Sequence, residues 1–405
     1  MSQFLPVEEQ LAQIKRGVSE IVPENELVAK LEKSRKENKP LRIKLGCDPT
    51  RPDLHLGHSV VLRKMRQFQD LGHHAILIIG DFTGMIGDPT GQNKTRPSLT
   101  IEQVRENGKS YFEQASKILH PDRTEIVHNS DWLSPMSFAD VIRLASKTTV
   151  ARMIERDDFS KRFGNNEAIS LHEFLYPLAQ GQDSVHLKSD VELGGNDQKF
   201  NLLVGRALQK EDGQAPQICL TMPLLVGTDG SQKMSKSYDN YIGLDEAPND
   251  MYGKSLSIPD SLIYTYFELL TDIGLDELAA MKEKAVADPR NAKHYLAYTI
   301  TRMYHGEDAA KGARDHFEKT VVKKAIPDDI PEFEIPTGEA RPLVAYIKDI
   351  GFSPSNGEAR RLVQQGGVSI DGEQIKDIRF EIVLEAGSEA VLKVGKRKFA
   401  RLKAV

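Results

Sequence analysis

Two histidines three residues apart are the first feature of this sequence that could do chemistry. His55 and His58 flank Gly57 and follow a proline-rich turn that begins at Asp48. At this spacing both imidazoles lie on one face of a helix, glycine keeps that face flat, and the helix N-terminus favours a phosphate. We therefore expect a nucleotide site, with adenine against Gly57 and phosphates near the imidazoles. The alternatives are a metal half-site, which no nearby Cys, His or Glu in the segment completes, and two surface histidines.

A second chemical feature is the basic segment at residues 227–237. Lys233 and Lys236 stand three residues apart among glycines and serines, with the hydroxyl of Ser235 between them. Lysine is a compact charge on a flexible stem, which suits a phosphate whose charge shifts during a reaction. The alternative is a solvated loop with incidental lysines. The pairing with the two histidines favours the phosphate-binding role.

Both features match the signatures of one family. Residues 55–58 (HLGH) closely resemble the HIGH signature of class I aminoacyl-tRNA synthetases, and residues 233–237 (KMSKS) match the second signature letter for letter. The resemblance implies ATP with Mg²⁺ as a substrate and tRNA as a partner. It implies that the catalytic residues are His55, His58, Lys233 and Lys236. It further implies that these four residues bind ATP together with Asp48, Thr50, Gly57, Asp197 and Ser235.

A set of polar side chains between the two signatures points to the second substrate. Tyr176, Gln180 and Asp183 recur at i, i+4 and i+7, so a phenol, an amide and a carboxylate share one helix face. Such a set is unfavourable to bury without a ligand. Asp88 follows a strand pattern and would pair with an ammonium group, and Gln198 follows a glycine turn that lets a ligand approach. The alternative is a helix that lies over the core with its polar residues outward.

These segments resemble tyrosyl-tRNA synthetases, and the pattern looks like a second bacterial branch of them. The resemblance implies that Asp88, Tyr176 and Gln180 hold the ammonium group of tyrosine. Asp183 would accept from the phenolic hydroxyl, and Gln198 would bind the carboxylate. Lys44 stands where the better-known branch has a tyrosine, so we expect Lys44 to donate to the phenolic oxygen. Gln92 likewise replaces a lysine of that branch.

The elements that must position these residues follow from hydrophobic periodicity. Residues 41–45 alternate as a strand, and helical spacing follows up to Gly72. Residues 75–79 are a continuous apolar run, typical of a strand buried on both faces. Further strands are predicted at 125–128, 190–193 and 223–227. We predict an α/β fold over residues 41–240, a Rossmann-like doubly wound parallel sheet with its ligands beyond the carboxyl ends of the strands.

The rest of the chain divides by composition. Residues 1–40 predict a helical segment, and residues 241–325 an all-α domain on the anticodon side of the tRNA, with a helix that begins at Asp288-Pro289 and ends at Gly306. A proline-rich linker is predicted at 326–342. Residues 343–405 predict a small α+β module.

The C-terminal module is the basic part of the chain. Residues 341–405 hold 12 Lys/Arg and 8 Asp/Glu, a charge of +4, whereas the whole chain carries -5 and the remainder therefore -9. Ser355 and Glu358 predict a capped helix start, and Asp371-Gly372 a hairpin. The module resembles an RNA-binding module of a ribosomal small-subunit protein, although a solvated basic face is the plain alternative. The residues expected to contact RNA phosphates are Arg360, Arg361, Lys396, Arg397 and Lys398.

Composition bounds the remaining possibilities. The two cysteines, Cys47 and Cys219, exclude a disulfide framework and a four-cysteine zinc site, and we expect no metal site in the protein itself. The apolar stretches are far shorter than a membrane span, so we expect no membrane partner and a cytoplasmic protein. The resemblance implies a homodimer that takes tyrosine, ATP and tRNA(Tyr). A tryptophanyl enzyme and a non-enzymatic RNA-binding paralogue are the rivals; Asp183 and the tail argue against the first, and both signatures against the second.

Overall fold

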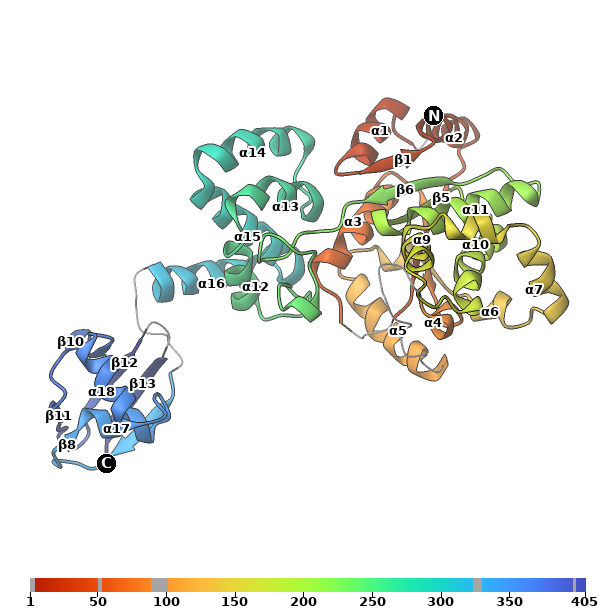
Figure 1. The fold of residues 1–405 in the computed structure, drawn as a ribbon. Helices are drawn as coiled ribbons and strands as arrows, with labels where there is room; N and C mark the ends of the chain where they lie inside the picture. Colours follow the sequence, from red (N-terminus) through yellow and green to blue (C-terminus); the bar gives the residue numbers. More distant parts are fainter. Residues whose placement is uncertain (1–3, 50–52, 89–100, 323–329, 396–397) are drawn as a thin grey trace. The chain divides into compact units, whose positions relative to one another are not determined.

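The computed structural model describes residues 1–405 except 1–3, 50–52, 89–100, 323–329 and 396–397 (Figure 1). The described chain forms two compact units, Met1–Ala310 and Lys311–Val405. Thr50, Gln92, Lys396 and Arg397, for which the sequence predicts a role or a replacement, lie outside the described residues. Within the described part of the chain, every helix is too short or too polar to cross a bilayer.

A six-stranded sheet organises the first unit, in the order β1-β6-β5-β2-β3-β4. Neighbouring strands from β6 to β4 are parallel, and β1 joins β6 antiparallel at the edge. The predicted Rossmann-like α/β fold is confirmed. The strands are β1 (Glu20–Val22), β2 (Arg42–Cys47), β3 (His74–Ile79), β4 (Thr124–His128), β5 (Val191–Gly195) and β6 (Ile218–Met222).

Two local predictions about strands were wrong. Residues 1–40 contain the three-residue strand β1 besides their helices, and a strand this short leaves no periodicity to detect. The predicted strand at 223–227 is absent among these described residues; the strand is β6, which ends just before Pro223. Proline lacks the N–H that a ladder requires, so the apolar run continues past the strand as loop.

Helices pack on both faces of the sheet and extend beyond it (Figure 1). Short helical turns are η1 (Pro121–Arg123), η2 (Leu171–Phe174), η3 (Asn196–Gln198), η4 (Lys236–Tyr238), η5 (Asp260–Leu262) and η6 (Glu318–Val322). The α-helices, of which α16 crosses the boundary between the units, are α1 (Val7–Lys15), α2 (Glu24–Glu37), α3 (Leu56–Asp70), α4 (Thr83–Ile86), α5 (Ile101–Ala115), α6 (Ser130–Leu133), α7 (Phe138–Ala145), α8 (Val150–Ile154), α9 (Asp157–Gly164), α10 (Leu175–Leu187), α11 (Lys199–Glu211), α12 (Pro248–Leu256), α13 (Ile263–Leu270), α14 (Leu275–Ala287), α15 (Pro289–His305) and α16 (Glu307–Phe317).

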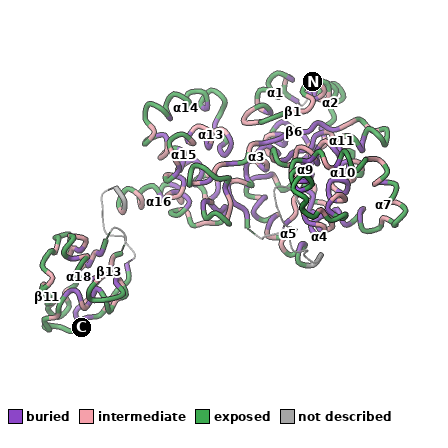
Figure 2. The backbone as a smooth tube through the Cα atoms, in the orientation of Figure 1, coloured by how far each residue is buried: buried purple, intermediate pink, exposed green. Residues whose placement is uncertain are grey.

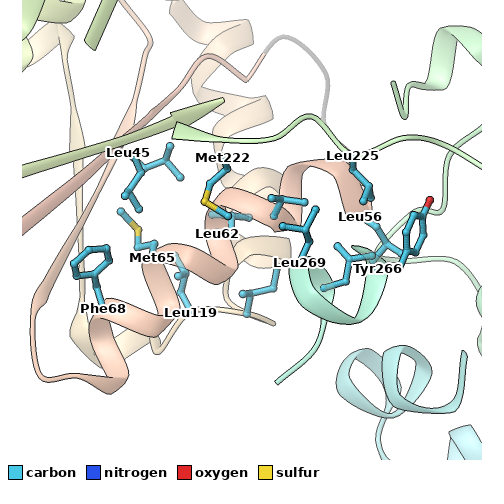
Figure 3. Packing of buried hydrophobic residues seen from close by; sticks show 14 of the residues in the cluster. Leu45, Leu56, Leu62, Met65, Phe68, Leu119, Met222, Leu225, Tyr266 and Leu269 are labelled. Carbon is cyan, nitrogen blue, oxygen red and sulfur yellow. The ribbon is translucent and has the colours of Figure 1, made fainter. Parts of the chain in front are cut away.

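Helix α3 is the centre of the main core, and the strands of the sheet beside it are also largely buried (Figure 2). Side chains of β2 alternate: Ile43 and Leu45 join the core around α3, whereas Lys44 faces α10 on the other side. The helix α15 begins at Pro289 with the Asp288 carboxylate as its cap and ends at Gly306, as predicted. Figure 3 shows the packing of α3 against the sheet and α13, with Leu45, Leu56, Leu62, Met65, Phe68, Met222, Tyr266 and Leu269 labelled.

The second unit has a five-stranded sheet, in the order β10-β9-β12-β13-β7, and a separate β8–β11 pair. Its hydrophobic cluster lies between this sheet and its two helices. The elements are β7 (Glu332–Ile335), β8 (Arg341–Pro342), α17 (Leu343–Asp349), α18 (Asn356–Gln364), β9 (Val368–Ile370), β10 (Glu373–Ile375), β11 (Glu381–Ile382), β12 (Glu389–Val394) and β13 (Lys398–Ala404).

The sequence predicted the helix cap and the hairpin turn of this unit better than the position where the unit begins. Ser355 caps α18 by accepting from the Glu358 N–H at 3.3 Å, and Asp371-Gly372 make the β9–β10 turn with positive φ at both residues. The range predicted as a spacer, however, contributes β7, which pairs with β13. This differs from the prediction because the prolines at 331 and 336 flank the strand and do not interrupt it.

Candidate active site

A cavity of about 250 Å³ opens at the carboxyl ends of β2, β3 and β5. This is the edge at which open α/β sheets bind their ligands. The predicted residues that line it come from five separate segments: Asp48, His58, Asp88, Tyr176, Gln180, Asp183 and Gln198.

Asp183 is the buried carboxylate of this cavity, with 3% of its surface exposed. Trp132 donates its indole N–H to Asp183 Oδ1 at 2.9 Å, and the Asn129 amide donates to Oδ2 at 3.4 Å. Burial raises the pKa of Asp183 to about 7, although the charge of Lys44 and these two hydrogen bonds lower it. A hydrogen-bond donor on a ligand would favour the ionised carboxylate, so the site suits a hydroxyl group.

A hydrogen bond between Asp48 and Tyr176 connects the residues predicted to bind ATP with those predicted to bind the amino acid. The Tyr176 hydroxyl donates to Asp48 Oδ2 at 2.7 Å, and the Thr83 hydroxyl donates to Oδ1 at 2.7 Å. Burial raises the pKa of Tyr176 well above its usual value, so its hydroxyl stays protonated. A Cβ at Gly80 would lie 1.9 Å from Asp48 Oδ1, and only glycine fits there. The carboxylate of Asp48 is thus fixed at the junction of the two sets.

Gln198 and Asp88 form a second pair among the residues that line the cavity, whereas Asp197 does not line it. The Gln198 amide donates to Asp88 Oδ2 at 2.8 Å, so these two residues from distant segments lie side by side. Asp197 is exposed on the turn η3 and lines a neighbouring groove. Its carboxylate is therefore placed at the rim, beside the cavity.

The two histidines form the cap of α3. His55 Nδ1 accepts from the Gly57 N–H at 3.1 Å, and His58 Nδ1 accepts from the His55 N–H at 3.2 Å. Because each Nδ1 accepts, the proton of each neutral ring is on Nε2, which is left to donate. A Cβ at Gly57 would lie 2.8 Å from the His55 ring, so the position of this ring over the backbone requires a glycine at 57.

Both imidazoles are uncharged at neutral pH. Burial first, and then the positive charge of Lys236, lower the pKa of His55 to about 3 and the pKa of His58 to about 4. The histidines can donate hydrogen bonds to an anion but do not bring positive charge. The lysines of the second signature must provide that charge.

The loop that carries those lysines is tied to the histidine segment. Leu56 N donates to Ile242 O at 2.9 Å and Leu244 N to Leu54 O at 3.0 Å, so the chain after the loop pairs with the chain at the histidines. Lys236 Nζ lies 2.5 Å from Asp53 Oδ2.

Within the loop, one side chain organises the backbone. The Asn240 amide accepts from the Ser235 N–H at 2.8 Å and donates to Asp229 at 3.0 Å, while Lys233 points outward and is exposed. Ser235 also caps the short turn η4.

Family models match nearly the whole chain. The model described as tRNA synthetases class I (W and Y) matches residues 36–322. The chain belongs to this family of class I tRNA synthetases. A second model, described as a tyrosine–tRNA ligase SYY-like C-terminal domain, matches residues 322–402 of the synthetase.

Relatives of this synthetase share its full length. It is 56% identical over 403 residues to a tyrosine–tRNA ligase of Salinibacter ruber, covering 99% of this chain and 98% of the relative. It is 57% identical over 399 residues to a tyrosine–tRNA ligase of Thermotoga maritima, covering 98% and 97%, and 52% identical over 398 residues to tyrosine–tRNA ligase 2 of Vibrio cholerae, covering 98% of each.

Solved structures share the fold. The synthetase superposes on a truncated mitochondrial tyrosyl-tRNA synthetase of Aspergillus nidulans with a TM-score of 0.63 at 23% identity, covering 76% of this chain and 92% of that one. An Archaeoglobus fulgidus tyrosyl-tRNA synthetase complexed with L-tyrosine gives 0.62 at 23%, covering 76% and 100%.

Lys44 of this synthetase does not occupy the predicted position. Its side chain is 1% exposed and does not line the cavity. Its ammonium group donates to Gln180 O at 3.2 Å and to Ser184 Oγ at 2.6 Å, and it lies 3.2 Å from Glu192 Oε1 in an ion pair. Lys44 is therefore not placed to donate to the phenolic oxygen as predicted, because α10 covers this face of β2 and supplies Gln180 O and Ser184 Oγ, while β5 supplies Glu192.

Sequence reasoning missed the residues that hold Asp183. Asn129 and Trp132 follow β4 directly, and Trp132 is the single tryptophan of the chain. Polar and aromatic residues in a loop after a parallel strand were the available signal. Glu192 gave none, since one acidic residue in an apolar strand has no distinguishing spacing.

Proposed function

We propose that this chain activates L-tyrosine with ATP to tyrosyl-adenylate and then transfers the tyrosyl group to the 3′ end of tRNA(Tyr). The observation that carries the choice of amino acid is the buried Asp183 carboxylate, held by Trp132 and Asn129 at the cavity wall. A phenol satisfies this carboxylate, whereas phenylalanine would leave it buried without a partner. The full-length relatives are tyrosine–tRNA ligases, which favours tyrosine over tryptophan as the substrate.

The reaction needs positioning and charge, without a covalent enzyme intermediate. The tyrosine carboxylate attacks the α-phosphorus of ATP, the bond to pyrophosphate breaks, and pyrophosphate leaves with the Mg²⁺ that ATP brought. The tRNA terminal hydroxyl then attacks the acyl carbon and AMP leaves. Neutral His55 and His58 donate from Nε2, and Lys233 and Lys236 follow the phosphate charge.

The remaining side chains bind the substrates. Asp88, Tyr176 and Gln180 hold the tyrosine ammonium, and Gln198 its carboxylate. ATP is held by Asp48 and Thr50, by the flat turn at Gly57, by Asp197 at the rim and by Ser235 of the lysine loop.

Pyrophosphate exchange tests this function directly. Purified protein should exchange labelled pyrophosphate into ATP with tyrosine, and not with tryptophan or phenylalanine. Exchange with tryptophan would keep the mechanism and overturn the assignment of Asp183. The absence of exchange with all three amino acids would overturn the enzymatic proposal.

The second unit is proposed to hold tRNA through phosphate contacts. Arg360 and Arg361 are exposed on α18, and Lys398 begins β13 with its ammonium on the Phe352 carbonyl at 2.8 Å. Lys396 and Arg397 are included on sequence grounds alone. Replacing both Arg360 and Arg361 with Ala should raise the KM for tRNA about tenfold, flatten its salt dependence, and leave tyrosine-dependent exchange unchanged. Equal loss of both activities would contradict this division.

A homodimer in the cytoplasm is also proposed. Large apolar side chains are exposed within one stretch of the first unit: Phe138 (80%), Ile142 (54%), Val150 (64%), Phe163 (62%) and Leu171 (83%). Apolar exposure of this density marks an interface, and the family resemblance suggests that a second copy covers it. Phe138→Asp should shift the mass measured by light scattering from dimer to monomer, whereas an unchanged mass would place the interface elsewhere.

A further inference from the structure

Beneath the proposed tyrosine site lies a buried ion pair that spans two strands. Lys44 on β2 and Glu192 on β5 are register partners in adjacent parallel strands, on the face that α10 covers. Their side chains are each 1% exposed, and Lys44 Nζ lies 3.2 Å from Glu192 Oε1. Opposite charges directly across neighbouring strands attract. Neither side chain lines the cavity.

Neighbouring groups hydrogen-bond with both members of the pair. Lys44 donates to Gln180 O and to Ser184 Oγ, besides its ion pair with Glu192. Glu192 accepts from the Gln180 amide at 3.0 Å and from Ser184 Oγ at 3.2 Å, and the Gln217 amide donates to it as well. Two of the groups held in this way, Gln180 and Ser184, belong to α10, and Asp183 lies next to Ser184.

This arrangement fixes which end of the Gln180 amide faces the cavity. An ionised carboxylate can only accept, so the NH₂ group of Gln180 must face Glu192. The carbonyl oxygen of the same amide therefore faces the other way, and Gln180 is a cavity-lining residue. An oxygen is the end of an amide that can accept from an ammonium group.

Stability alone does not explain a charged pair at this place. Buried ion pairs are often no more stabilising than apolar residues of similar volume, because both charges must be desolvated. The pair does, however, act on the recognition residues. Lys44 lowers the pKa of Asp183 and Glu192 raises it, while burial remains the largest effect on that pKa.

We propose that the Lys44–Glu192 pair is a positioning device for amino-acid recognition. Glu192 holds the Gln180 amide so that its carbonyl oxygen accepts from the substrate ammonium. Lys44 holds the turn of α10 that carries Gln180 and Asp183. This inference rests on the proposed tyrosine-activating function and names Glu192, which lies outside the cavity, as a determinant of substrate affinity.

Glu192→Gln tests the proposal with little change in shape. A glutamine at 192 can donate to the Gln180 carbonyl as readily as it accepts, so the orientation of that amide is released. The KM for tyrosine should rise about 10- to 100-fold, with kcat at saturating tyrosine and the KM for ATP within twofold of the parent protein. The loss should be confined to ligands with an ammonium group. The deamino analogue of tyrosine, which keeps the phenol and the carboxylate, should inhibit exchange with an unchanged inhibition constant.

Matched variants separate positioning from general damage. Glu173→Gln removes a carboxylate from another buried ion pair, Arg162–Glu173, whose atoms lie 2.6 Å apart away from the cavity; its KM for tyrosine should stay within twofold. The double variant Lys44→Met with Glu192→Gln should recover melting temperature relative to Lys44→Met alone, yet keep the raised KM for tyrosine. Equal weakening of tyrosine and its deamino analogue by Glu192→Gln would overturn the inference. Failure of the proposed function is distinct, because the parent protein would then show no tyrosine-dependent exchange.

Discussion

Asp183 and the ion pair behind the cavity are held differently from the lysine loop. Asp183, Lys44 and Glu192 are almost fully buried, and side chains from several elements hydrogen-bond with them. In the loop, Lys233 is exposed and Lys236 pairs with Asp53, whose side chain is 62% exposed. One region fixes its donors and acceptors before a substrate arrives, and the other presents charge on flexible stems.

The difference separates discrimination from catalysis. A buried polar group strongly penalises a ligand that lacks its partner, so a fixed site reads chemical groups. A phosphate that changes charge and position during a reaction is followed better by lysines near water. Three predictions on rate and substrate affinity test the contrast in order of decreasing effect, and a fourth, on stability, accompanies the second.

Removing the main loop charge should give the largest effect. Lys236→Ala should lower the rate of adenylate formation about 10²–10³-fold, with the KM for tyrosine little changed, because the lost charge acts on the phosphate. Single-turnover measurement of adenylate formation provides the test, and Ser237→Ala serves as a neighbouring control. A rate within twofold of the parent protein would contradict the role of Lys236.

Protonation of the Asp183 carboxylate should give an intermediate effect. The pKa of Asp183 is raised to about 7 by burial, so below this pH the carboxyl group carries a proton before tyrosine binds. Tyrosine affinity should therefore fall about tenfold between pH 8 and pH 6, and Asp183→Asn should abolish that dependence.

The stability of the protein should depend on Asp183 with the opposite pH trend: tyrosine affinity rises with pH, whereas stability falls. Because the folded-state pKa of Asp183 lies above its unfolded value, the folded state binds more protons between about pH 4 and pH 7. The contribution of Asp183 to the free energy of unfolding then falls as pH rises through this window. Calorimetric tyrosine binding and denaturant melts are measured for the parent protein and for Asp183→Asn at each pH. Identical pH profiles of the two proteins would disprove the role of Asp183.

Loosening the loop contact should give the smallest effect. Asp53→Asn removes the exposed partner of Lys236, and exposed ion pairs contribute about 1 kcal/mol or less. The KM for ATP should fall two- to threefold as Lys236 becomes available to phosphate. A tenfold change in either direction would show that this contact is part of the fixed site.

Much of the fold could be predicted from the sequence because it depends on local patterns. The alternation over residues 41–45, the apolar run at 75–79 and the Asp288-Pro289 start predicted β2, β3 and α15 to within a few residues. The i, i+4, i+7 spacing placed Tyr176, Gln180 and Asp183 on one face of α10, and all three line the cavity. Strands of three residues, such as β1, and the strand inside the proline-rich range left too little pattern to read.

The sequence by itself determined which residues could take part in binding or catalysis and which helix or strand carries them. This is because spacing along an element fixes the face on which a side chain lies. Only the tertiary structure decided their state. Burial beside Lys236 made His55 and His58 neutral donors, and Trp132 of α6 and Asn129 just before it reached Asp183 from another segment. The pairing of β2 with β5 joined Lys44 to Glu192 in a buried ion pair behind the cavity. Desolvation and cross-strand partners depend on residues far apart in the chain, and local spacing carries no record of them.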